Sequence, residues 1–218
     1  FLRNLYRTFF VILFWFKDFG LRKLYFGLLI LTLPFTLSAK DYFWVGGSGD
    51  WNQSEHWSLT SGGKGYAGVP TISDNVIFDN YSFSAQGQEV VVSTKAFCKN
   101  FINHSLIVFK LRGDKNSNIE VAESFYAKNF FENNFEGKIN FSASKQSYIQ
   151  SSGITFNDIV FNNSNGKWLL LDHLERDEAA VNYLKSGKLD FNGNVLKKGG
   201  IEVGKRTATE LNISESDL

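Results

Sequence analysis

Short apolar runs recur from Val76 onward with little sign of helical periodicity, and this pattern limits the possible folds more than any other feature. Many of the runs alternate apolar and polar residues, as strands with one buried face do. Glycine occurs 19 times and proline only twice, which suits short strands joined by tight turns. The chain is therefore predicted to be all-β.

Three of the runs share one design, in which Gly-Lys is followed by apolar residues at alternate positions. They are EGKINFSA (136–143), NGKWLLLD (165–172) and SGKLDFNG (186–193), and their glycines lie 29 and 21 residues apart. Spacings of this size suit one coil of a parallel β-helix or β-solenoid, in which each coil stacks its inward side chains on the previous one. We predict a solenoid, with a β-sandwich as the alternative. Helix is compatible with the sequence only at 172–185, which suits a loop between coils equally well.

The N-terminal residues resemble an export signal. An apolar block at 24–39 follows Arg22 and Lys23 and precedes the polar Lys40 and Asp41. A basic flank, an apolar stretch and small residues in this order are typical of a secretory signal peptide, and we predict cleavage after Ala39. A second apolar patch lies at 9–16, so an uncleaved membrane anchor is the alternative, and it would be the chain's only link to a membrane.

The predicted organisation has three parts: a leader at 1–39, a Trp/Gly-rich cap at 40–80 and a β-strand repeat region at 81–218. The upstream residues of the leader are expected to include some that are not native to the protein. The chain begins with Phe1, contains no methionine and ends within a strand-like run. We therefore expect it to be a piece of a longer protein, truncated on its C-terminal side.

The charge of the chain argues against a nucleic-acid partner. After residue 39 there are 18 basic and 21 acidic residues, a net charge of −3, whereas binding a phosphate backbone needs a concentrated positive face. The single cysteine, Cys98, excludes an intramolecular disulfide and is expected to be a small buried apolar residue.

Three tryptophans lie close together in the predicted cap. Trp44, Trp51 and Trp57 are seven and six residues apart, with several glycines between the first two. Because glycine permits positive φ and close backbone approach, the chain can fold back here and stack its indoles. We predict a compact cap that covers the open end of a sheet. The alternative is a carbohydrate-binding platform, in which the indoles stack on sugar rings and Asp50 binds hydroxyl groups.

The segment WVGGSGDWNQSEHWS (44–58), followed by SGGKGYAGVPTISDNVIFD (61–79), resembles the opening segment of very large secreted surface proteins of gliding, type IX-secreting bacteria. In those proteins a similar block follows the signal peptide and precedes long β-rich repeat regions with adhesion-like modules. The resemblance implies a secreted or cell-surface protein that is adhesin-like or structural and not an enzyme. Its implied partners are surface glycans or other extracellular macromolecules.

A catalytic role has weaker support in the sequence. Solenoid enzymes that cleave acidic polysaccharides place acidic and basic residues on adjacent coils, and the alternative function is such a carbohydrate-binding or polysaccharide-cleaving β-helix. Its candidate residues would be Asp158, Asp172, Lys188 and Asp190. A catalytic carboxylate pair is defined by its separation in space, so the sequence alone does not identify one.

No cofactor is predicted. The histidines His56, His104 and His173 lack the spacing of metal ligands. Asp74 and Asp79 flank an apolar run, and calcium bound to such oxygen-rich positions is the alternative to a metal-free protein.

Overall fold

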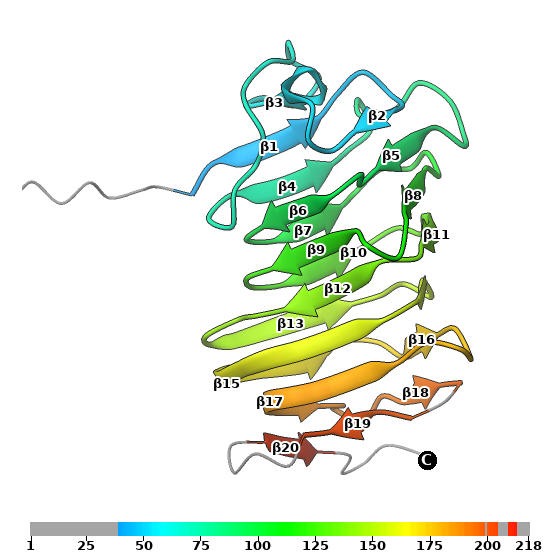
Figure 1. The fold of residues 1–218 in the computed structure, drawn as a ribbon. Coiled ribbons are helices and arrows are strands. Elements are labelled where there is room, and N and C mark those ends of the chain that lie inside the picture. Colours follow the sequence, from blue (N-terminus) through cyan, green and yellow to red (C-terminus); the bar gives the residue numbers. More distant parts are fainter. Residues whose placement is uncertain (1–38, 199, 205–208, 213–218) are drawn as a thin grey trace, which may run out of the picture. The chain divides into compact units, whose positions relative to one another are not determined.

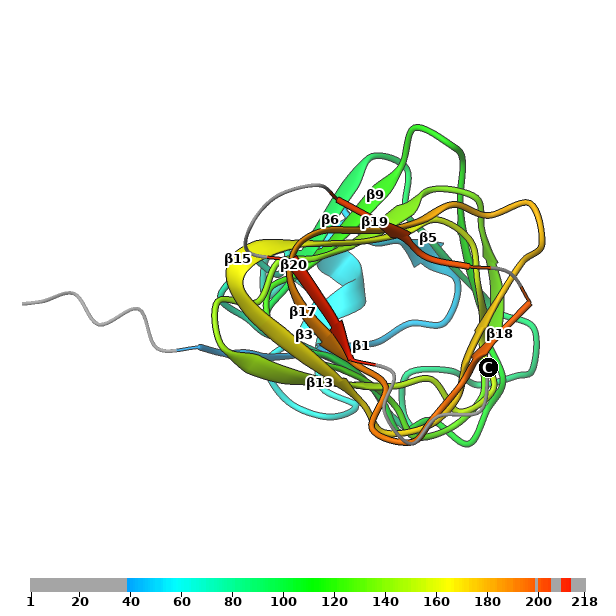
Figure 2. The same ribbon diagram turned by 90° about the horizontal axis from the view of Figure 1, so that it is seen from below.

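The computed structural model describes residues 39–198, 200–204 and 209–212, and residues 38–218 belong to one compact unit. The predicted leader at 1–39 lies outside the described residues except for Ala39. From residue 41 the chain winds as a β-solenoid whose coils have three faces (Figures 1 and 2). Strands of successive coils pair in parallel, which confirms the predicted solenoid and contradicts the sandwich alternative.

From β4 (Asn75–Phe78) onward each coil contributes a strand to each face. Face 1 contains β1 (Asp41–Trp44), β4 (Asn75–Phe78), β7 (Phe101–Asn103), β10 (Phe125–Ala127), β13 (Gln146–Gln150) and β20 (Thr209–Asn212). Face 2 contains β6 (Lys95–Cys98), β9 (Asn118–Val121), β12 (Lys138–Phe141) and β19 (Glu202–Val203). Face 3 contains β2 (Gly49–Asp50), β5 (Glu89–Val91), β8 (Lys110–Gly113) and β11 (Glu132–Phe135), followed by β14 (Thr155–Phe156), β16 (Leu174–Arg176) and β18 (Leu196–Lys197).

Two long strands run around the corner between faces 2 and 1. They are β15 (Ile159–Leu170) and β17 (Asn182–Asp190), and each begins on face 2 and ends on face 1. Their pairing shifts register between Phe161 and Lys167, where the strand bends. The helix that was one of two options for 172–185 is absent, because this segment holds β16 and the start of β17 with a turn between them.

The interior is filled by rows of apolar side chains in register. On face 1, Val76 pairs with Phe101, and Phe101 pairs with Phe125. The rings of Phe101 and Phe125 stack with centroids 4.6 Å apart. On face 2 the inward row contains Ala96, Ile119, Ile139 and Ile159, all buried. Each coil therefore buries its alternate residues against the coil before it, as the alternating pattern predicts.

Only two of the three Gly-Lys runs occupy equivalent positions on successive coils. Lys167 pairs with Lys188, so the 21-residue spacing of Gly166 and Gly187 is one coil on face 1. The first run is different, because Lys138 begins a strand of face 2. The 29-residue spacing therefore joins positions on two different faces, and reading it as one coil was wrong.

The N-terminal segment forms one end of the sheet of face 1. Strand β3 (Trp57–Ser58) pairs antiparallel with β1, after the single-turn helix η1 (Ser54–His56). Strand β4, which lies within the predicted cap, pairs with both β1 and β7. The sheet therefore continues across residue 80, and the predicted boundary between cap and repeat region is not a structural boundary.

Polar side chains interrupt the interior in a later coil. Asn182 takes the place after Ile159 in the inward row of face 2, and its amide atoms have no hydrogen-bond partner among the described residues. Arg176 is also buried and donates to the carbonyl oxygens of Gly200 and Glu178, both at 3.0 Å. Because unsatisfied buried polar groups are costly, Asn182 stabilises its coil less than an apolar residue would at this position.

Cys98 is buried in the interior of face 2, as expected. Burial raises the pKa of its thiol above the ordinary value, and the nearby Glu120 carboxylate adds to this rise. The thiolate, which is the reactive form, is therefore disfavoured at this position.

Candidate functional site

The three indoles of the predicted sugar platform meet in space, but they do so inside the core. Trp44, Trp51 and Trp57 are each 0% exposed. The ring centroid of Trp57 lies 5.0 Å from that of Trp44 and 5.1 Å from that of Trp51. A sugar stacks on a free aromatic face, and these rings have none. The carbohydrate platform assigned to these tryptophans is therefore wrong, because the indoles pack as the cap's hydrophobic core.

Asp50, the polar member of that platform, has a local structural role. Its carboxylate accepts a hydrogen bond from the backbone N–H of Asn52 at 2.7 Å, and its carbonyl oxygen accepts one from Gln53 at 3.0 Å. These bonds close the turn after β2. With the indoles buried below it, Asp50 has no stacking surface beside it at which to orient a sugar.

The two candidate calcium ligands have different surroundings. Asp74 is 6% exposed, and its carboxylate accepts bonds from the N–H and hydroxyl of Thr71 and the N–H of Lys40. Burial alone would raise the pKa of Asp74, but these hydrogen bonds lower it below its ordinary value. Asp79 accepts bonds from the Ser61 hydroxyl and the Tyr81 N–H. The described residues contain no group of three or more metal-binding side chains.

Two of the four candidate catalytic residues join neighbouring coils. The Asp158 carboxylate accepts a bond from the N–H of Val181 at 2.8 Å. The Asp172 carboxylate accepts bonds from the N–H and hydroxyl of Ser151 and from the N–H of Ser152, at 2.7–2.9 Å. Both carboxylates therefore satisfy backbone donors of an adjacent coil.

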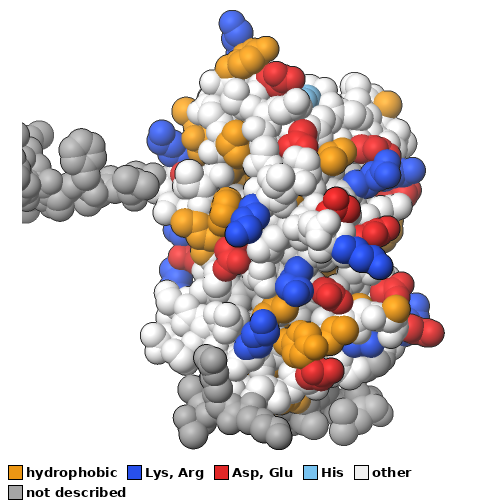
Figure 3. All heavy atoms as spheres, viewed as in Figure 1, with side chains coloured by type: hydrophobic (Ala, Val, Ile, Leu, Met, Phe, Trp, Pro, Cys, Tyr) orange, Lys and Arg blue, Asp and Glu red, His pale blue; other side chains and the backbone are white. Residues whose placement is uncertain are grey.

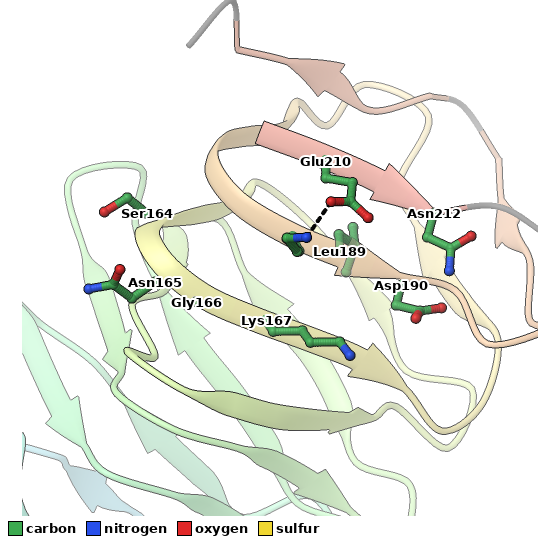
Figure 4. A pocket seen from close by; sticks show the side chains of 9 residues that line it. Ser164, Asn165, Gly166, Lys167, Leu189, Asp190, Glu210 and Asn212 are labelled. Atoms are coloured by element: carbon green, nitrogen blue, oxygen red, sulfur yellow. Dashed lines mark ion pairs between the residues drawn. The ribbon is translucent and has the colours of Figure 1, made fainter. Parts of the chain in front are cut away.

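The other two candidates, Lys188 and Asp190, line a groove of about 430 Å³ on face 1 (Figure 4). The groove crosses three coils because Lys167 pairs with Lys188, and Lys188 with Glu210. Lys188 and Glu210 form an ion pair, and each side chain is more than half exposed. The remaining polar lining residues are Ser164, Asn165 and Asn212.

The corner beside this groove is shaped by glycines. A Cβ on Gly166 would lie 2.5 Å from the Trp168 ring, and one on Gly187 would lie 2.8 Å from it. The two glycines let the buried Trp168 ring reach the corner, and the lysine that follows each of them faces the groove. Lys167 and Glu210 were missed as candidates, although the one-coil spacing of the two Gly-Lys pairs places Lys167 beside Lys188.

The groove combines ammonium, carboxylate and amide groups, so it suits hydrogen bonding to a polar ligand. Within the described part of the chain, Lys167 makes no ion pair, so its ammonium group is available to such a ligand. The Asp190 carboxylate accepts a hydrogen bond from the N–H of Asn192 at 2.9 Å, and its side chain lines the groove (Figure 4).

No family model, curated protein or solved structure matches this chain. Among the residues that the structure describes, no helix is long and apolar enough to cross a membrane.

Proposed function

We propose that this chain is a non-enzymatic, exported protein that acts outside the cell as a structural or adhesive β-solenoid. The observation that carries the proposal is the three-sided stack of parallel strands with outward side chains in register. Since each coil contacts only its neighbours, such a stack presents a rigid face with a repeated row of side chains. The leader-like N-terminal residues and the resemblance to gliding-bacteria surface proteins support the extracellular assignment.

The surface charges support a macromolecular contact surface that is not specialised for nucleic acid. Glu123 lies between two lysines of adjacent coils, with its Oε1 atom 3.7 Å from Lys99 Nζ and 2.8 Å from Lys145 Nζ. On the side of the solenoid seen in Figure 3, basic and acidic side chains are interspersed with hydrophobic ones. The use of Asp158 and Asp172 in bonds between coils supports a structural role over a catalytic one.

Export is testable with the full chain carrying an added initiator methionine and a C-terminal epitope. We expect the epitope on intact bacterial cells or in the medium, on a product that begins at Lys40. Placing two charges in the apolar block, L29R with L31R, should keep the protein inside the cell, because a charged block no longer works as a signal peptide. The matched variant L13R, in the upstream patch, should be exported normally. Unprocessed wild-type chain inside the cell would contradict the proposal.

A second candidate function, binding of an acidic glycan, is supported by the two lysines of the groove, Lys167 and Lys188. We expect oligouronates to bind there and the double variant K167A with K188A to lose about tenfold in affinity, since each lysine would make a charge-assisted hydrogen bond. Calorimetric titration measures this loss, with the exposed Lys115→Ala as control. Equal affinity of the wild type and the double variant would exclude this groove. Release of unsaturated products would indicate a cleaving enzyme.

A further inference from the structure

Three successive coils carry the same outward pattern at the end of face 1. Each coil has an apolar residue, an ionisable residue and a second apolar residue at alternate positions. The three sets are Ile77, Asp79, Tyr81; Ile102, His104, Leu106; and Tyr126, Lys128, Phe130. They recur after 25 and 24 residues, the spacing of the paired Ile77, Ile102 and Tyr126. Sequence reasoning missed this repeat, because it compared only the Gly-Lys runs.

Backbone hydrogen bonds hold the three sets side by side beyond the ends of the strands. The N–H of His104 donates to Phe78 O at 2.7 Å, and the N–H of Lys128 donates to Asn103 O at 3.0 Å. The N–H of Leu106 donates to Asn80 Oδ1 at 3.0 Å. These bonds align the inner and middle positions of the three coils, and the bond to Asn80 ties Leu106 to the coil before it. We call the nine side chains together the three-row surface.

The outer apolar row of this surface is unusually open to solvent. Tyr81 and Leu106 are each 72% exposed and Phe130 is 47% exposed. The inner apolar row, with Ile77, is partly exposed. Apolar side chains gathered in this way on a soluble surface mark an interaction site.

The middle row changes charge along the solenoid. Asp79 is acidic, Lys128 is basic, and His104 lies between them. Burial lowers the pKa of His104 below its ordinary value, Lys128 lowers it further, and Asp79 partly opposes the change. At neutral pH the middle row therefore carries a negative, a neutral and a positive side chain in this order. A second copy of the row in the opposite direction places each charge next to the opposite charge.

We propose that the three-row surface binds a second copy of this chain around a two-fold axis that runs along the strand β7. This rotation reverses the order of the coils and keeps each row over the same row of the partner. Asp79 then faces the partner's Lys128, and Lys128 faces the partner's Asp79. His104 meets its own counterpart at the axis, and the apolar rows lie on apolar rows. An isologous contact of this kind requires a self-complementary patch, which the three-row surface is.

The contact is small. Four residues of strand span about 13 Å and three coils span about 10 Å, so the three-row surface covers much less than the roughly 800 Å² per partner of a standard interface. A contact of this size is weak and transient, and we expect it to form only at high protein concentration. The inference rests on the fold and is independent of export and of the groove.

Exchange of the paired charges tests the dimer in the compact unit 38–218. Sedimentation velocity should show that the average mass of the wild type rises with protein concentration. The variants K128D and D79K should each remain monomeric, because a symmetric dimer of either one brings like charges together twice. An equal mixture of the two variants should associate again. D79K carries lysine at positions 79 and 128, K128D carries aspartate at both, and each lysine then faces an aspartate of the other chain. A merely destabilised fold would not produce this rescue.

Two controls complete the experiment. Lys115→Asp makes the same change of charge at an exposed loop and should associate like the wild type. The Asp79 carboxylate also accepts a hydrogen bond from the Tyr81 N–H, and D79K removes this bond. Thermal unfolding must therefore show that D79K is folded. If D79K is unfolded, Leu106→Glu replaces it, and this variant should be monomeric because it buries two charges at the axis. A wild type that stays monomeric at millimolar concentration, or a K128D variant that associates like the wild type, would overturn the proposal.

Discussion

Replacing Trp57 with alanine should lower the free energy of unfolding by about 4 kcal/mol, as expected for truncation of a fully buried tryptophan. Its ring contacts two further indoles and lies 6.3 Å from the ring of Phe78, measured between centroids. Its Nε1–H donates to the carbonyl oxygen of Trp51 at 2.6 Å. The alanine variant therefore leaves a cavity in the cap and an unsatisfied buried carbonyl group.

Urea unfolding followed by circular dichroism measures this loss. The exposed Tyr66, in the same N-terminal segment, offers a control, and Tyr66→Ala should change stability by less than about 1 kcal/mol. Because contacts in a solenoid are local, hydrogen exchange in W57A should accelerate first in β1 and β4. A loss below about 1 kcal/mol for W57A would show that the indoles do not form the core of the cap.

Replacing Gly187 with alanine should cost about 3 kcal/mol, because the position combines backbone strain with overpacking. Gly187 has a φ of +99°, which an L side chain rarely adopts. A Cβ there would lie 2.4 Å from Asn163 O and 2.8 Å from Gly166 O, both atoms of the backbone in the adjacent coil. Neither atom can move away without a change of the backbone at the corner between faces 2 and 1.

A comparison with Gly153 separates the effect of backbone strain from the effect of overpacking. Its φ of +78° is also positive, but a Cβ on it would meet nothing within 4 Å. Gly153→Ala should therefore cost only about 1 kcal/mol, from backbone strain alone. Thermal or urea unfolding of the two variants gives the difference, which measures the close approach of the coils at Gly187. Equal losses would contradict the close approach.

The strands and the solenoid were predictable because alternation is visible in short stretches of sequence. EGKINFSA and SGKLDFNG both alternate and both form strands, but nothing within them shows that one belongs to face 2 and the other to face 1. Segment 172–185 has apolar residues at spacings that a helix also allows. Pairing of β16 and β17 with adjacent coils makes it β-structure, and that pairing is tertiary.

The candidate sites were less predictable, because exposure is not a local property. Trp44, Trp51 and Trp57 have the composition of a sugar platform, and only the packing shows that their rings face inward. Asp172 and Asp190 are similar as residues, but one bonds to Ser151 of the adjacent coil and the other borders a groove.

Local sequence was sufficient to predict the all-β class and a solenoid of short strands, because side-chain alternation and turn formation depend on near neighbours. It did not give the coil length, since only one of the two glycine spacings, 21 and not 29 residues, corresponds to a coil. The faces, the groove and the three-row surface came only from the fold. Parallel pairing brings residues 24 or 25 positions apart to within one strand spacing, as it does for Ile77 with Ile102 and for Ile102 with Tyr126. Which side chains meet across coils thus depends on the length of every corner between them, and the packed structure sets that register.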